Sequence, residues 1–113
     1  MNKIIIYNVR PNIRNVRNCR ACQFLADDAE RSVNEISNLL LTYAGSDEHL
    51  SKIYTNGYDR VAIMATDPHT GKIELTRVGD EDWVVVHRYT NGAYDIFVLS
   101  DLMMSRLYRH SAK

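Results

Sequence analysis

Arginine and asparagine are the side chains that hydrogen-bond guanine and adenine edges in pairs, and arginine also neutralises phosphate. The chain carries both types in four successive Asn-apolar-Arg triplets: Asn8-Val9-Arg10, Asn12-Ile13-Arg14, Asn15-Val16-Arg17 and Asn18-Cys19-Arg20. Residues 1–26 hold five bases and no acid, whereas the other 87 residues hold nine bases and fourteen acids. The zero net charge therefore hides a polarised sequence that suits an anionic partner.

The use of these side chains depends on the backbone that carries them. If residues 11–22 form a helix with Pro11 in its first turn, the arginines fall on one stripe and the apolar residues on another. The segment is then first an amphipathic packing element, and second a surface for an acidic protein or for nucleic acid. The candidate partner-binding residues here are Arg10, Arg14, Arg17, Arg20, Asn12 and Asn15.

Cys19 and Cys22 have the spacing of a zinc knuckle. A structural zinc ion takes four ligands, however, and no second Cys or His pair follows. A redox dithiol would need a βαβ context that the Arg-rich run does not supply. We therefore predict two reduced, part-buried thiols, no metal site and no cofactor.

Two places offer the residue types of an enzyme. His69 lies in a predicted turn, where a general base would be accessible, and the acids at 80–82 could hold a divalent cation if other oxygens converged. No motif places a nucleophile beside His69, and a run of acids is typical of a solvated hairpin tip. We predict no catalytic residues, with His69 or the 80–82 carboxylates as the enzymatic alternative.

The middle of the chain indicates helices. Apolar residues recur at helical spacing from Val33 to Tyr43, after Asp27-Asp28 and before Gly45, which predicts a helix over about 28–44. Ser46-Asp47-Glu48 can cap a shorter helix that runs through Tyr54 and ends at Asn56-Gly57. Residues 3–7 are β-branched and aromatic, which suits a short buried strand.

From Val61 the period changes to two, and turn residues follow at 68–71, 79–82 and 91–92, which predicts an antiparallel meander. A type I′ turn at Asn91-Gly92 would pair Arg88 with Asp95 and Val86 with Phe97. One face would then carry Trp83 and Val85, and the other Val84, Val86, Phe97 and Leu99. A C-terminal helix beginning at Ser100-Asp101 is the expected cover for one face, and a second copy of the protein is the alternative.

These patterns predict one domain over residues 1–113 with an α+β fold. The predicted antiparallel sheet has four to five strands and includes the C-terminal meander. One main helix packs on one face of the sheet, and short helices flank the sheet. Apolar content of 45% and charged content of 25% are ordinary globular values. No run is apolar enough to span a bilayer and none resembles a signal peptide, so we expect no membrane partner and a cytoplasmic protein.

We therefore expect a small non-enzymatic binding protein that docks onto a macromolecular partner, with a protein complex as the expected partner. Compact chains without motifs are common among virus- and mobile-element-encoded inhibitors of host defence machines. By analogy, such an inhibitor is the specific form of binding protein that we consider. Binding of RNA or DNA through residues 8–20 is the alternative. Tyrosines are enriched at binding hot spots, so the candidates extend to Tyr54, Tyr58 and Tyr94.

Overall fold

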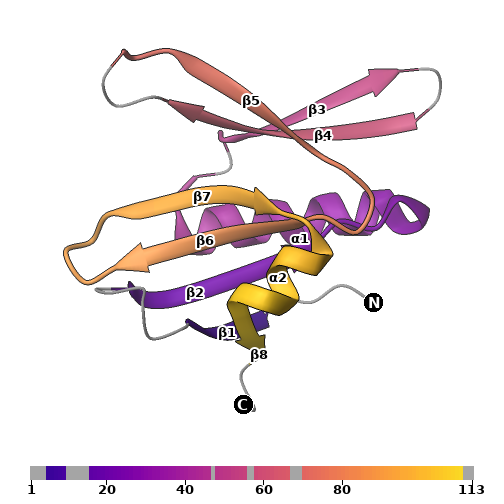
Figure 1. Cartoon of the computed structure of the whole chain (residues 1–113). Coiled ribbons are helices and arrows are strands. Elements are labelled where there is room, and N and C mark those ends of the chain that lie inside the picture. Colours follow the sequence, from indigo (N-terminus) through magenta and orange to yellow (C-terminus); the bar gives the residue numbers. More distant parts are fainter. Residues whose placement is uncertain (1–4, 10–15, 47, 56–57, 67–69, 111–113) are drawn as a thin grey trace.

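A computed structural model describes residues 5–9, 16–46, 48–55, 58–66 and 70–110. It is an α+β fold with antiparallel sheets, one main helix and one short helix (Figure 1). The elements in chain order are β1 (Ile5–Val9), β2 (Val16–Gln23), a 3-10 turn η1 (Ala26–Asp28), α1 (Ala29–Tyr43), β3 (Leu50–Thr55), β4 (Tyr58–Thr66), β5 (Ile73–Val78), β6 (Trp83–Tyr89), β7 (Tyr94–Leu99), α2 (Asp101–Leu107) and β8 (Tyr108–His110). Among the described helices, none is long and apolar enough to cross a membrane.

The larger sheet has five strands in the order β7-β6-β2-β1-β8, all antiparallel. β1 pairs with β2 through its first residues and with β8 through its last. In Figure 1, α1 lies behind this sheet and α2 in front of it. The two helices therefore give the sheet two covered faces, which suits strands that are apolar on both sides.

Two hydrophobic clusters fill these faces. Behind the sheet, Cys22, Val84 and Val86 pack with residues of α1 that include Ile36 and Leu40. In front of it lies a cluster of Cys19, Ala21, Trp83, Val85 and Met104. Met104 belongs to α2, so the predicted C-terminal helix does cover one face of the hairpin.

The smaller sheet has the order β3-β4-β5. Val61, Ile63 and Val78 project from one of its faces into the same core as α1 and β6. The other face carries Ala62, Met64, Leu75 and Arg77, because register partners share a face. This second face lies away from the larger sheet (Figure 1).

The predicted helix over 28–44 is confirmed as α1, although its first turn is capped differently. The Asp28 side chain makes no capping hydrogen bond. Instead the Ser32 hydroxyl accepts from Leu25 N–H at 3.0 Å and donates to Asp28 O at 2.9 Å. Gly45 ends the helix with a φ of 79°, as its position predicted.

The helical reading of residues 11–22 is wrong where the structure describes this segment, because Val16–Gln23 form β2. Cys19 and Ala21 face α2, whereas Cys22 faces α1. The apolar residues of this segment have a helical spacing, but long-range pairing determines its structure, since β2 is hydrogen-bonded to β6 along almost its whole length.

The shorter helix predicted through Tyr54 is also wrong, because Leu50–Thr55 form β3. β3 pairs with β4 from Leu50↔Ile63 to Thr55↔Tyr58. The Asn-Gly dipeptide therefore does not mark a helix end, because the segments on either side of it are hairpin partners. Residues 56–57 themselves lie outside the described part of the chain.

The predicted four-stranded meander is wrong as well, because β5 and β6 belong to different sheets. The connection at 79–82 does not close a hairpin. Glu81, at a φ of 69°, donates its N–H to Phe24 O at 2.8 Å, and Phe24 N–H donates to Asp82 O at 2.8 Å. These bonds tie the connection to the end of β2 and direct the chain into the larger sheet.

The β6–β7 hairpin exists, but its register differs by one residue from the prediction. Arg88 pairs with Tyr94 and Val85 with Phe97. A type I′ turn needs positive φ at both central residues, and here Gly92 has a φ of 88° while Asn91 is not in that region. The loop is three residues long and closes where Tyr89 N–H donates to Ala93 O at 2.8 Å.

The one-residue difference in register determines which side chains of β7 lie on each face of the hairpin. Phe97 and Leu99 pack with Trp83 and Val85 under α2, rather than with Val84 and Val86. Ile96 and Val98 take the places on the α1 side. Both faces remain apolar, as predicted.

Candidate functional site

The structure describes the predicted partner-binding residues unequally. Arg10, Asn12, Arg14 and Asn15 lie outside the described residues. For three others only the backbone is described, within β2, β3 and β4 respectively: Arg17, Tyr54 and Tyr58. Arg20 and Tyr94 are described fully, and both lie on the α1 side of the larger sheet.

Arg20 and Tyr94 are linked through Tyr43 and Arg88 in a polar cluster at the end of α1. The guanidinium carbon of Arg20 lies 4.8 Å from the centroid of the Tyr43 ring, which is cation–π geometry. Arg88 Nη1 donates to the backbone carbonyl oxygen of Tyr43 at 3.2 Å. Tyr94 lies opposite Arg88 in the register.

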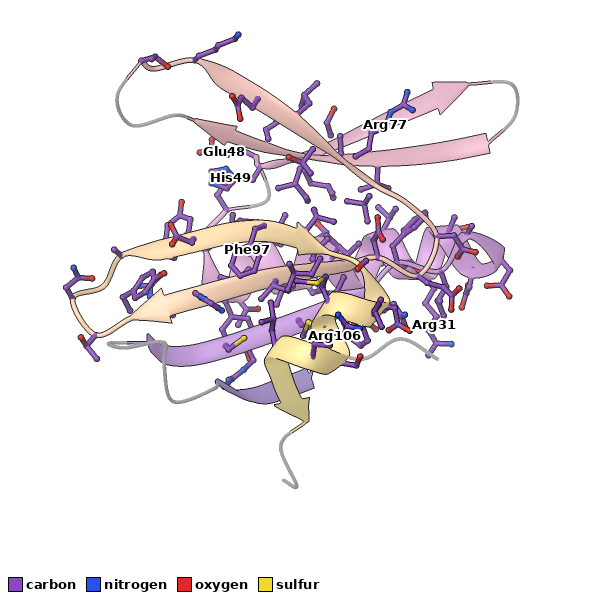
Figure 2. All side chains as sticks on the ribbon, in the orientation of Figure 1. Arg31, Glu48, His49, Arg77, Phe97 and Arg106 are labelled. Atoms are coloured by element: carbon purple, nitrogen blue, oxygen red, sulfur yellow. The ribbon has the colours of Figure 1, made fainter. Side chains whose placement is uncertain are left out.

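The Tyr94 hydroxyl extends the cluster to His49, whose Nε2 is 3.1 Å away. We call Arg20, Tyr43, His49, Arg88 and Tyr94 the Tyr43 cluster. Figure 2 shows His49 on the side of the larger sheet that the smaller sheet approaches. The cluster thus ties four elements, β2, α1, β6 and β7, to the segment that enters β3.

Electrostatics explain why two arginines lie here. The last carbonyl groups of a helix carry partial negative charge, which favours cations near its C-terminus. The same field disfavours a bound anion at this end. Among the described residues, Arg20 Nη1 is buried and has no hydrogen-bond partner. We therefore interpret the Tyr43 cluster as a clamp on the end of α1.

The two cysteines are buried on opposite faces of β2, Cys19 in the cluster under α2 and Cys22 in the core under α1. Burial raises the pKa of each thiol to about 12. A thiol with so high a pKa is a poor nucleophile and a poor metal ligand at neutral pH. The opposite faces also keep the two sulfurs from sharing one ion.

The acids at 80–82 stabilise the connection between the sheets. Asp80 Oδ1 accepts a hydrogen bond from Ala26 N–H at 2.8 Å, and Asp82 Oδ2 accepts from Gly79 N–H at 2.8 Å. Within the described residues, no group of three or more His, Cys, Asp or Glu side chains could hold a metal ion. His69 lies outside those residues.

His87 is a second histidine of interest, because it is buried on the same face of β6 as Trp83 and Val85. It lies 4.8 Å from Phe97, centroid to centroid, with the rings nearly perpendicular. Burial lowers its pKa, and the charge of Asp95 on the neighbouring strand opposes that shift. Asp95 in turn accepts a hydrogen bond from the Tyr89 hydroxyl at 2.7 Å, which raises the pKa of Tyr89 to about 12.

β5 presents exposed apolar side chains on an edge strand. Five of its six residues are exposed, and they include Ile73 at 63% and Leu75 at 57%. Both side chains lie on the outer face of the smaller sheet, next to Met64 and Arg77. Large apolar side chains on the outside of a strand are a common mark of a contact surface.

Among the described strands, none pairs with the second side of β5, because β5 is the last strand of its sheet. Met64 N–H donates toward β3, to His49 O at 2.7 Å. The alternation of an antiparallel ladder then directs the groups of Ile63 toward β5, where it pairs with Thr76. The N–H and C=O groups of Ile73, Leu75 and Arg77 consequently point to the open edge.

We call the open edge and outer apolar side chains of β5 the β5 surface, and define it by Ile73, Leu75 and Arg77. Figure 2 shows Arg77 on the smaller sheet, pointing away from the larger one. The sequence pattern does not predict this surface, since it predicts 73–78 as an inner strand of a meander. Three further exposed apolar side chains lie on the helices: Leu41, Leu102 and Met103.

A scan against protein-family models, a search of curated proteins and a search of solved structures each returned no match for this chain.

Proposed function

We propose that this chain is a small non-enzymatic protein that acts by docking onto a protein partner through the β5 surface. The observation that carries the proposal is an edge strand with open backbone groups and two exposed apolar side chains, Ile73 and Leu75. An added strand satisfies such an edge with main-chain hydrogen bonds, while side chains on the outer face give specificity. Natural proteins usually protect an edge of this kind unless it is used.

The chemistry of the other candidate residues supports binding over catalysis. The thiols have pKa values near 12 and are buried. Asp80 and Asp82 accept hydrogen bonds from backbone groups that shape the 79–82 connection. These side chains stabilise the fold. We therefore propose that the described residues act through a docking surface.

The Arg-rich segment keeps its place in the proposal as a second contact. Arg10, Arg14 and Arg17 would add electrostatic attraction to an acidic partner, and the same residues would serve RNA or DNA in the alternative function. Inhibition of a host defence machine by a virus- or mobile-element-encoded protein is the form of docking that we propose for this second contact.

The test compares the wild-type chain with Leu75→Lys and with Leu102→Lys. Leu102 is the matched control, because it is 61% exposed on α2, close to the 57% of Leu75. Each tagged protein is incubated with extract from the source cells, with and without nuclease, and bound proteins are identified and re-measured in purified form. Docking through β5 predicts a nuclease-resistant protein partner that Leu75→Lys loses and Leu102→Lys keeps.

Two results would contradict the proposal. A partner lost equally in both variants, or kept in both, would remove β5 as the contact. Binding abolished by nuclease, with affinity that falls steeply as salt rises, would favour the nucleic-acid alternative.

A further inference from the structure

We infer that the partner that fits the β5 surface is a second copy of this chain, joined edge to edge so that the two smaller sheets become one continuous antiparallel sheet. This inference rests on the docking role proposed for β5, and it adds the identity of the partner and the register. It starts from the three residues whose backbone groups point outward: Ile73, Leu75 and Arg77.

A two-fold axis perpendicular to the sheet keeps the outer faces on the same side, so paired residues must have the same parity. Outward-pointing groups must also meet outward-pointing groups, which selects odd-numbered partners. Centred on Leu75, the register pairs Leu75 with its own copy and Ile73 with Arg77 of the second copy. Every outward N–H and C=O of the β5 surface then has a partner.

The neighbouring registers are worse. A shift toward Glu74 as the centre places that carboxylate opposite its own copy, and like charges directly opposite each other are destabilising. A shift toward Thr76 as the centre leaves Ile73 opposite Gly79, which lies in the connection beyond the strand. The register centred on Leu75 is therefore the one that the sequence of β5 favours.

The side chains agree with this register. On the outer face, the exposed Leu75 side chains meet at the axis and shield each other from water. Each exposed Ile73 lies beside the aliphatic stem of Arg77, which can cover apolar surface while its guanidinium stays in water. On the other face Glu74 lies opposite Thr76, so no charge meets its like.

Charge at the level of the whole chain also permits self-association. The formal net charge is zero and the isoelectric point of the sequence is about 6.9. Two copies therefore approach without net repulsion near neutral pH, the condition in which proteins associate most readily. Within β5 itself, no proline blocks the edge.

Cysteine cross-linking tests the register directly. In an antiparallel hydrogen-bonded pair the Cα atoms lie about 5.5 Å apart, within the roughly 4.4 to 6.8 Å that a disulfide spans. The Leu75→Cys variant should therefore form a disulfide-linked dimer under mild oxidation. The native cysteines do not interfere, because both are buried.

Two control variants define the outcome. Leu102→Cys has a similar exposure on α2 and should give only the slow, random cross-linking of any exposed thiol. Thr76→Cys should also give little, because Thr76 lies opposite Glu74 and not opposite itself. Efficient cross-linking of Thr76→Cys in place of Leu75→Cys would overturn the register.

Sedimentation of the protein without added cysteines tests the dimer itself. The wild-type chain should change from monomer to dimer as its concentration rises, and Leu75→Lys should raise the dissociation constant roughly tenfold or more, because two like charges then face each other at the axis. Leu102→Lys should leave the constant unchanged.

A wild-type chain that stays monomeric at every concentration would overturn the dimer. If Leu75→Lys nevertheless abolished capture of a different protein, the docking role of β5 would stand and only its partner would be wrong. If Leu75→Lys changed neither association nor capture, both proposals would fail.

Discussion

Trp83 Nε1 donates a hydrogen bond to Asp101 Oδ1 across 2.8 Å, and this bond joins the start of β6 to the first residue of α2. Gln23 Nε2 also reaches the same carboxylate oxygen, at 3.3 Å. The carboxylate therefore anchors α2 over the front of the larger sheet, where Met104 enters the cluster around Val85.

Replacing Asp101 with alanine should lower the free energy of unfolding by about 1 to 2 kcal/mol, because a hydrogen bond to a charged acceptor is lost and α2 is less firmly held. Trp83 is the only tryptophan, so its fluorescence during urea unfolding measures the change. Asp101→Asn keeps an oxygen acceptor and should lose less. Equal losses in the two variants would show that the hydrogen bond does not matter.

Stability should fall on the acidic side of neutrality because of His87. Burial lowers its folded-state pKa below the value near 6.5 of the unfolded chain. The unfolded state then binds a proton more readily, so the contribution of His87 is complete above about pH 6.5 and is lost as the pH falls toward the folded pKa. In urea titrations at several pH values, His87→Gln should flatten this slope. An unchanged slope would assign the pH dependence to other groups.

Both thiols should resist modification in the folded protein. Their burial and their pKa values near 12 predict slow reaction with an aromatic disulfide reagent in native buffer, and rapid reaction of both thiols in urea. Single variants, Cys19→Ala and Cys22→Ala, assign the signal to each position. Fast labelling of either thiol under native conditions would contradict the buried position.

The turn between β6 and β7 should depend on Gly92. Its φ of 88° is unfavourable for residues with a side chain, and a Cβ added there would meet no atom within 4 Å. Gly92→Ala should therefore cost about 1 kcal/mol for conformational reasons alone, measured by thermal or urea unfolding. Gly92→Asn should cost less, since asparagine tolerates this region better. An alanine variant as stable as the wild type would be inconsistent with the observed turn.

The Tyr43 cluster gives a further stability test. Tyr43→Phe retains the ring under Arg20 and the carbonyl that accepts from Arg88, so its stability should change little. Tyr43→Leu loses the ring, and the loss of the cation–π contact should cost roughly 0.5 to 1 kcal/mol in urea unfolding. Similar stability for the two variants would show that the ring contact contributes nothing.

The sequence by itself determined the elements whose signals are local. The helical spacing from Val33 to Tyr43 and the stop at Gly45 predicted α1, and Ser100-Asp101 predicted a C-terminal helix over the hairpin. The α+β class and the antiparallel strands also followed from periodicity. These features depend on residues close together in the chain, so their physical causes are visible in short segments.

The tertiary structure alone decided which strands share a sheet. β2 has a helical spacing of apolar residues, yet it became a strand because β6 and β1 pair with it from either side. The meander was divided because Phe24, more than fifty residues earlier in the chain, supplies the hydrogen bonds that redirect 79–82. Long-range pairing of this kind cannot be predicted from the sequence of either segment alone.

The candidate contact surface was decided at the same level. Whether Ile73 and Leu75 lie in a core or on an open edge depends on the order of strands, and the alternating pattern of β5 is the same in both cases. The sequence predicts Arg20 and Tyr94 as partner-binding residues. The structure places Arg20 against the Tyr43 ring and Tyr94 opposite Arg88, which donates to the Tyr43 carbonyl oxygen. Burial is a property of the assembled sheets, so the sequence by itself does not show which side chains lie at an open strand edge.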